Sequence, residues 1–194
     1  GLTALHALLE GTGHHLSSDT WYPLIEAIAS LSGGADIDCG IDRGITAWST
    51  CSMLSFRCLK LIVDDFLDIL PSPPDLCSAG TRSALLDCCA AFGRSQHDVN
   101  TSLTATGMLW TIADQDLTPN SLDRVLEKLS SLSFDGRVEV RNCSVNTLFS
   151  CVIGLGDRLA PEQWRVCLSE KLFGVLQQVA QLRSGDSSPI DASQ

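Results

Sequence analysis

Apolar residues recur along most of this chain at intervals of three and four residues, which is the period of an amphipathic α-helix. Glycines, prolines and polar clusters interrupt the pattern. Proline after Thr118 and after Ala160 marks two helix starts, because proline fits the first helical position. No segment shows the strict alternation of a strand, so the sequence predicts an all-α fold. We predict eight helices, near residues 2–10, 20–32, 45–70, 80–93, 98–114, 119–132, 138–154 and 161–182.

The sequence pattern of one helix hairpin occurs twice in the chain, with the copies 143 positions apart. The stretch from Gly13 to Trp21 recurs from Gly156 to Trp164 with the same Gly-x-x-Leu-x4-Trp spacing. Each copy has an apolar helix, a glycine break and a second helix with an early tryptophan. We expect the two tryptophans, Trp21 and Trp164, to be equivalent core wedges at the starts of the second helices. Repeated hairpins bury their apolar faces only against neighbouring repeats. We therefore predict a HEAT/armadillo-like α-α superhelix, a right-handed solenoid over residues 1–183.

The last residues, 184–194, are rich in Ser, Gly, Asp and Pro, and this composition predicts a disordered tail. The chain has no initiator methionine and opens within a predicted helix, so we expect it to be an excerpt of a longer protein. No apolar run approaches the roughly 18 residues that a membrane-spanning helix needs.

The net charge of −10 argues against a nucleic-acid partner, because phosphate binding needs clustered Lys and Arg. The charge is uneven. Residues 1–75 hold ten acidic and three basic residues, a net of −7, whereas residues 124–183 hold six acidic and eight basic residues, a net of +2. This bipolarity could orient the chain on a protein partner or an anionic membrane.

Nine cysteines are present, but no C-x-x-C pair that would indicate a zinc or redox site. Most sit within apolar helical faces, where a cysteine behaves as a small hydrophobe. An odd number of such cysteines favours a reducing compartment, the cytosol or a cytosolic membrane face. No cofactor or metal is expected.

The candidate catalytic residues are weak. Ser95, His97 and Asp98 have the residue types of a triad, but neighbours in one turn cannot align as nucleophile, base and orienter. We expect them to turn the chain and cap the fifth helix. No catalytic residue is therefore assigned.

The candidate metal ligands are weak too. His14 and His15 point apart and lack a third ligand. Asp36, Asp38 and Asp42 resemble a calcium loop, but the glutamate expected at its twelfth position is missing. We favour a turn at the histidines and loop solvation at the aspartates.

A HEAT-like signature precedes the second hairpin copy. Asp135, then Val140-Arg141, then Ser144 and Leu148 resemble the second-helix pattern of HEAT repeats. An Asp near a helix start complements the helix dipole, an Arg can pair with the acid of an adjacent repeat, and a small residue lets helices approach closely.

Two charged pairs are candidates for a partner surface. Asp64 and Asp68 give the third predicted helix an acidic face, and a basic partner would dock there if anywhere in this half. Arg137 and Arg141 are the corresponding basic candidates. For Arg141 an ion pair between repeats is the favoured alternative to partner contact.

The fifth predicted helix carries a family resemblance. Residues Asn100 to Asp114, with Gly107 and Trp110, follow almost residue for residue an Asn-x-Ser-Leu-Thr-x-x-Gly-Leu-Leu-Trp-x-Ile-Ser-Asp pattern of the Mon-two family. Lys128 to Ser150, including Asp135, and Leu61 to Leu67 are similar to further segments of that family. The resemblance covers residues 45–180. Residues 115–125 are shorter than the pattern, so a loop is lost or omitted there.

The resemblance implies a part of a large, non-enzymatic scaffold in Golgi–endosome vesicle trafficking. Such proteins are related to the large Arf exchange factors but lack their catalytic domain. The implied partners are a Dopey-type protein, an Arf-like small GTPase and a phospholipid flippase, with peripheral association on trans-Golgi network and endosome membranes from the cytoplasm. Self-association is also allowed. The alternative is a regulatory helical-repeat region of a large Arf guanine-nucleotide exchange factor.

Overall fold

The computed structural model describes residues 1–32, 43–71, 80–96, 98–116 and 119–177 of the chain. Within these ranges all regular structure is helical, which confirms the predicted all-α class. The α-helices are α1 (Leu2–Thr12), α2 (Ser18–Ser30), α3 (Arg43–Asp65), α4 (Thr81–Arg94), α5 (Val99–Gln115), α6 (Pro119–Leu132), α7 (Val138–Leu155) and α8 (Pro161–Val166). Short 3-10 turns η1 (Gly13–His15), η2 (Leu67–Ile69) and η3 (Gly156–Arg158) separate some of them, and the π-helical segment η4 (Cys167–Leu172) continues α8.

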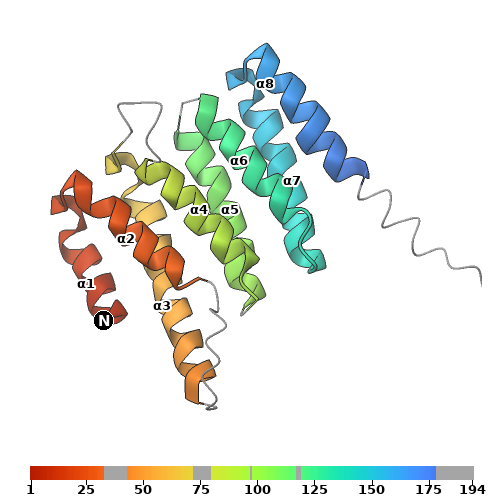
Figure 1. Cartoon of the computed structure of the whole chain (residues 1–194). Helices are drawn as coiled ribbons and strands as arrows, with labels where there is room; N and C mark the ends of the chain where they lie inside the picture. The colour runs from red at the N-terminus through yellow and green to blue at the C-terminus, as the bar shows by residue number, and fades with distance from the viewer. Residues whose placement is uncertain (33–42, 72–79, 97, 117–118, 178–194) are drawn as a thin grey trace, which may run out of the picture.

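The helices form two layers (Figure 1). Helices α1, α3, α5 and α7 pack successively along one layer, and α2, α4 and α6, followed by η4, pack along the other. Helices of the two layers also contact each other, as α4 does α5 and α6 does α7. Each helix thus packs against helices one or two elements away in the chain, which is the architecture of a helical-repeat solenoid.

Helix α5 lies in the middle of the stack although its sequence is rich in Thr and Ser. It contacts α3, α4, α6 and α7, and its buried face includes Ser102, Ala105, Thr106 and Leu109. The hydroxyl of Thr106 donates to the carbonyl of Ser102 at 2.8 Å, so this polar group needs no partner elsewhere. Small, internally satisfied side chains therefore let four helices pack around a sequence of modest helix propensity.

The third helix ends earlier than its hydrophobic pattern predicted. The pattern runs to residue 70, but α3 ends at Asp65 and Phe66 leaves the helical region with φ −123°. The Phe66 ring is buried between His14 and Trp21, at centroid distances of 4.8 and 5.4 Å. The ring thus packs against the first hairpin at the point where α3 ends. Ile69 and its neighbours then form the separate turn η2.

The repeated hairpin has the same backbone in both copies. Gly13 and Gly156 each begin a 3-10 turn. In both copies the glycine carbonyl accepts a hydrogen bond, at 3.1 Å, from the backbone amide of the leucine three residues later. Leu16 and Leu159 are both extended, with ψ of 138° and 132°, and the next helix follows. The internal repeat predicted from the sequence is therefore a structural repeat.

The two tryptophans of the repeat, expected to be equivalent core wedges, differ in burial. Trp21 is 1% exposed and packs on Phe66, whereas Trp164 is only half-buried. A Cβ on Gly13 would lie 2.4 Å from the Phe66 ring, and one on Gly156 would lie 2.6 Å from the Trp164 ring. In each copy the glycine makes room for an aromatic ring, but the ring comes from a different element.

Several predictions fall outside the described residues. They concern the acidic loop with Asp36, Asp38 and Asp42, the tail over 184–194, and His97. The two helix starts at Pro119 and Pro161 are confirmed. None of the helices that the structure describes is both long and apolar enough to cross a membrane.

Candidate interaction surfaces and their supporting network

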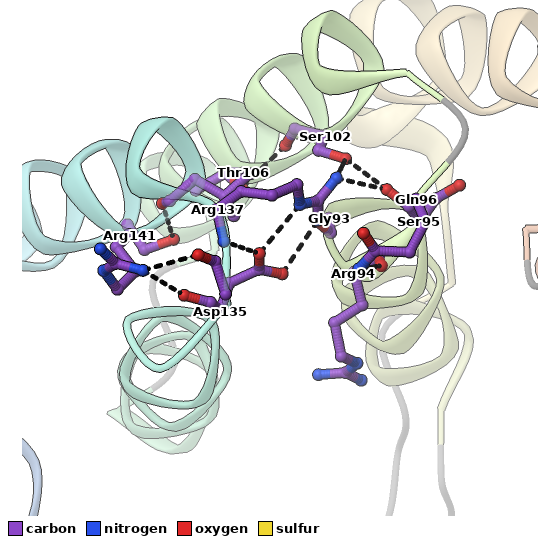
Figure 2. A network of polar contacts seen from close by, with 12 residues as sticks. Gly93, Arg94, Ser95, Gln96, Ser102, Thr106, Asp135, Arg137 and Arg141 are labelled. Atoms are coloured by element: carbon purple, nitrogen blue, oxygen red, sulfur yellow. Dashed lines mark hydrogen bonds and ion pairs between the residues drawn. The ribbon is translucent and has the colours of Figure 1, made fainter.

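The Asp135 signature builds a polar network at the start of α7 (Figure 2). Arg137 Nε and Nη2 each lie 2.9 Å from an Asp135 carboxylate oxygen, a bidentate pair. The Asp135 and Arg137 side chains are 6% and 16% exposed. The Arg137 guanidinium, which donates hydrogen bonds to this carboxylate, holds the pKa of Asp135 below its usual value, and the same bonds raise the pKa of Arg137.

Arg137 also reaches across the stack to the end of α4. Its Nη2 donates to the carbonyl of Gly93 at 3.0 Å, and its Nη1 donates to the carbonyl of Ser95 at 2.6 Å. Nη1 further donates to the Ser102 hydroxyl at 3.0 Å, and that hydroxyl itself donates to the Ser95 carbonyl at 2.9 Å. The last carbonyls of a helix lack intrahelical partners and carry a negative partial charge. Arg137 therefore caps α4 from another repeat.

Arg141 does not make the pair between repeats that the sequence favoured for it. Its Nη1 donates to the carbonyls of Asp135 and Gly136, at 2.9 and 2.8 Å, within its own repeat. The connection between repeats is made by Arg137, four residues earlier. Ser144 is fully buried on α7, consistent with the small residue expected at a close helix contact.

The same device recurs at two other helix or turn ends. Arg158 in η3 donates to the carbonyls of Ala113 and Asp114 in the last turn of α5, at 3.0 and 3.2 Å. Arg82 in α4 donates to the carbonyl of Leu67 in η2 at 3.0 Å. Each arginine follows the segment that it caps in the chain. Sequence periodicity did not identify this role, because the partner is a backbone carbonyl.

Asp64 and Asp68, the acidic candidates, are both exposed. Asp64 forms an ion pair with Lys60 one turn earlier in α3. Asp68 lies beyond the end of α3, in η2, so the two carboxylates do not share one helical face as predicted. They remain candidates for partner contact, whereas the guanidinium of Arg137 is engaged inside the fold.

The family-pattern residues of α5 have mixed roles. Trp110 packs against Gly154, where a Cβ would lie 2.8 Å from its ring, so it joins α5 to α7. Asn100 is exposed, and a Cβ on Gly107 would meet nothing within 4 Å. Of these three, Trp110 has the clear packing role.

Of the residues with triad chemistry, Asp98 caps the fifth helix, as predicted. Asp98 accepts the backbone amides of Asn100 and Thr101 at 3.2 and 2.9 Å at the start of α5. Hydrogen bonds from Thr101, chiefly from its hydroxyl, lower the pKa of Asp98. Ser95 is the C-cap of α4.

The buried thiols of the described helices are poor nucleophiles. Burial raises the pKa of Cys88 and of Cys151 to about 12, and it raises the pKa of Cys89 as well. Within the described ranges no three His, Cys, Asp or Glu side chains gather as a metal site would require.

One open groove lies between α2 and α4, with a volume of about 430 Å³. Tyr22 and Glu26 line it from α2, and Ser83 and Asp87 line it from α4. Their spacing in the sequence is too large for any local motif to indicate it.

Comparison with known proteins gives consistent relatives. The chain is 30% identical over 169 residues to a Drosophila melanogaster protein named MON2 homolog, which covers 72% of this chain and 10% of that protein. The Schizosaccharomyces pombe MON2 homolog is 34% identical over 116 residues, which cover 59% of this chain and 6% of that protein. The Homo sapiens MON2 homolog is 27% identical over 162 residues, which cover 64% of this chain and 9% of that protein. The chain thus spans about a tenth of the length of such relatives, whose names describe no enzyme. No family model and no solved structure matches the chain.

Proposed function

The chain belongs to the Mon2 family, and from that premise we propose that it is a non-enzymatic interaction module of a vesicle-trafficking scaffold. The scaffold works on the cytoplasmic side of Golgi and endosome membranes. The module binds protein partners by the shape and charge of its two helical layers. The observation that carries this proposal is the two-layer stack, in which Arg137 and Arg158 bond to backbone carbonyls of earlier repeats.

The chemistry of the described residues supports binding rather than catalysis. Asp135, Arg137 and Ser102 bond to each other or to backbone carbonyls. The deeply buried thiols of Cys88 and Cys89 have raised pKa values. Stacked helical repeats, in contrast, present extended surfaces for partners.

The partners that we propose are a Dopey-type protein, an Arf-like small GTPase and a phospholipid flippase. Exposed acidic side chains, including Asp64 and Asp68, are the surface to which a basic partner segment would bind. The alternative, a regulatory region of an Arf exchange factor, predicts an effect on nucleotide exchange.

Proximity labelling in cells tests the proposal. The chain is fused to a biotin ligase and compared with the ligase alone. We expect enrichment of proteins from Golgi and endosome membranes. Labelling no different from the ligase alone would contradict it.

A nucleotide-exchange assay on Arf-type GTPases with the purified chain tests the alternative. We expect no change in the exchange rate. Stimulated exchange would favour the exchange-factor region and overturn the proposal.

A further inference from the structure

The groove between α2 and α4 differs in its charge pairing from the other two interfaces of the same layer. Between α4 and α6, Asp87 pairs with Lys128 at 2.7 Å and with Arg124 at 3.9 Å. Between α6 and η4, Lys171 pairs with Asp123 and donates to its backbone carbonyl at 3.0 Å. Both interfaces thus join an acid to a base.

At the α2–α4 interface, each of the two helices contributes an acidic residue. Glu26 of α2 and Asp87 of α4 line the same groove, and both are exposed. Among the described residues, Glu26 accepts a hydrogen bond from the Tyr22 hydroxyl at 2.7 Å and has no Lys, Arg or His within salt-bridge distance. Because Asp87 is already paired with α6, the uncompensated charge in the groove belongs to Glu26.

A second observation marks the groove as a ligand site. Ser83 lines it and is 6% exposed, yet its hydroxyl oxygen is buried and has no hydrogen-bond partner. A buried hydroxyl without a hydrogen-bond partner is destabilising, so native structures rarely retain one. A ligand with hydrogen-bond donors would satisfy this group.

The remaining lining fits a flat cation. Ala29 and Ala84 keep the groove clear with small side chains, and Tyr22 contributes an aromatic ring. The volume of about 430 Å³ is within the range of ligand pockets, about 300–1,000 Å³. An arginine guanidinium offers five donors in a plane, pairs with carboxylates and stacks on aromatic faces.

We propose that the α2–α4 groove binds an arginine side chain presented by a segment of a protein partner. The guanidinium bonds to the carboxylate of Glu26, lies against the ring of Tyr22, and donates to the hydroxyl of Ser83. This site deepens the proposed function and rests on it, since it names the chemistry of one partner contact.

Titration of the full chain, labelled with ¹⁵N, by N-acetylarginine amide tests the site. N-acetylcitrulline amide is the neutral, nearly isosteric control probe. We expect amide shifts confined to the groove, around Ala29 and Ala84. The citrulline probe should bind at least about tenfold more weakly, because it cannot form the charge-assisted hydrogen bonds to Glu26. Equal binding of the two probes, no binding, or shifts spread over other acidic surfaces such as Asp64 would overturn the proposal.

Matched variants make the test specific. Glu26→Gln should weaken the arginine probe about tenfold, and Ser83→Ala should weaken it about threefold, with the helical circular dichroism of the chain kept. Glu162→Gln, which removes an exposed acid of α8 at the far end of the stack, should change nothing. Unchanged binding of the arginine probe by Glu26→Gln, or an equal loss of binding in Glu162→Gln, would refute the proposed arginine site.

Failure of the groove and failure of the proposed function are distinguishable. If Glu26→Gln labels the same partners in cells as the wild-type chain and the titration is negative, the groove is refuted while the interaction module stands. If the wild-type chain labels no partners at all, the proposed function itself fails.

Discussion

The Nη1 atom of Arg137 lies 2.6 Å from the backbone carbonyl oxygen of Ser95, a residue 42 positions earlier in the chain. Arg137 is the N-cap of α7, and Ser95 is the C-cap of α4. One side chain therefore joins two helices from opposite layers that are not consecutive in sequence. Because Asp135 holds the same guanidinium by two further bonds, the arginine is oriented before it reaches α4.

Replacement of Arg137 by alanine should lower the free energy of unfolding by about 3 kcal/mol. The change leaves a largely buried Asp135 carboxylate unpaired and the last carbonyls of α4 without their donor. Urea unfolding followed by circular dichroism measures the loss.

Arg141→Ala is the matched control for that variant. Arg141 bonds only to nearby carbonyls within its own repeat, so we expect a loss of about 1 kcal/mol or less. Similar losses for both arginines would mean that the contact across the repeats contributes nothing particular.

The Asp135 pair should make stability depend on pH in acid. Its pKa in the folded chain lies below the ordinary value of 3.8, so its contribution is fully present above about pH 4 and disappears as the pH falls through the folded pKa. Asp135→Asn should therefore be about 2 kcal/mol less stable than the wild type at neutral pH. The gap should narrow steadily below about pH 4. Urea unfolding across this pH range measures the difference in stability between the wild type and Asp135→Asn. A difference that widens in acid would contradict the proposed role of the Asp135 pair.

Glycine substitutions distinguish close packing from mere helix composition. Gly13→Ala should destabilise the chain by about 1–3 kcal/mol, because the new Cβ would lie 2.4 Å from the buried ring of Phe66. Gly11→Ala, two residues earlier, meets nothing within 4 Å and should stabilise α1 by up to about 1 kcal/mol. Thermal melts of the two variants should shift in opposite directions; shifts of one sign would count against the packing at Gly13.

The two copies of the hairpin should respond differently to loss of their tryptophans. Trp21→Ala removes a side chain that is 1% exposed and should cost about 3–5 kcal/mol. Trp164→Ala removes a half-buried ring and should cost about half as much. Denaturant titrations of both variants give the comparison, and equal losses would restore the equivalence predicted from the sequence.

The buried thiols should resist alkylation in the native chain. At about pH 8, Cys88 and Cys151, each with a pKa of about 12, should react with iodoacetamide far more slowly than half-buried Cys143. Peptide mapping by mass spectrometry identifies the modified sites, and the same experiment in urea is the control in which all should react. Early modification of Cys88 would show that the core opens readily.

The sequence predicted the fold because its signals are local. Proline at residues 119 and 161 starts two helices where expected, and the Gly13 and Gly156 hairpins have matching backbones. The error at the end of α3 arose from tertiary packing. The apolar period continues to residue 70, but Phe66 packs on Trp21 and the helix ends at Asp65.

The site was much harder to predict, because its partners are distant or are backbone atoms. Arg137 was a surface candidate in the sequence, yet it bonds to carbonyls at residues 93 and 95 that no side-chain pattern marks. The α2–α4 groove joins Glu26 to Ser83, which are 57 positions apart. A charge pattern shows which residues are ionised, but only the packing shows which of them remain free to meet a partner.

The central claim is that this chain is a binding module, and direct binding measurements on purified components test it most directly. The full chain is titrated separately against a Dopey-type protein, an Arf-like small GTPase and the cytosolic segments of a phospholipid flippase. We predict saturable binding to at least one of them, weakened by Asp64→Lys/Asp68→Lys or by Glu26→Gln without loss of helical structure. Absence of saturable binding to all three, with the chain folded, would contradict the claim.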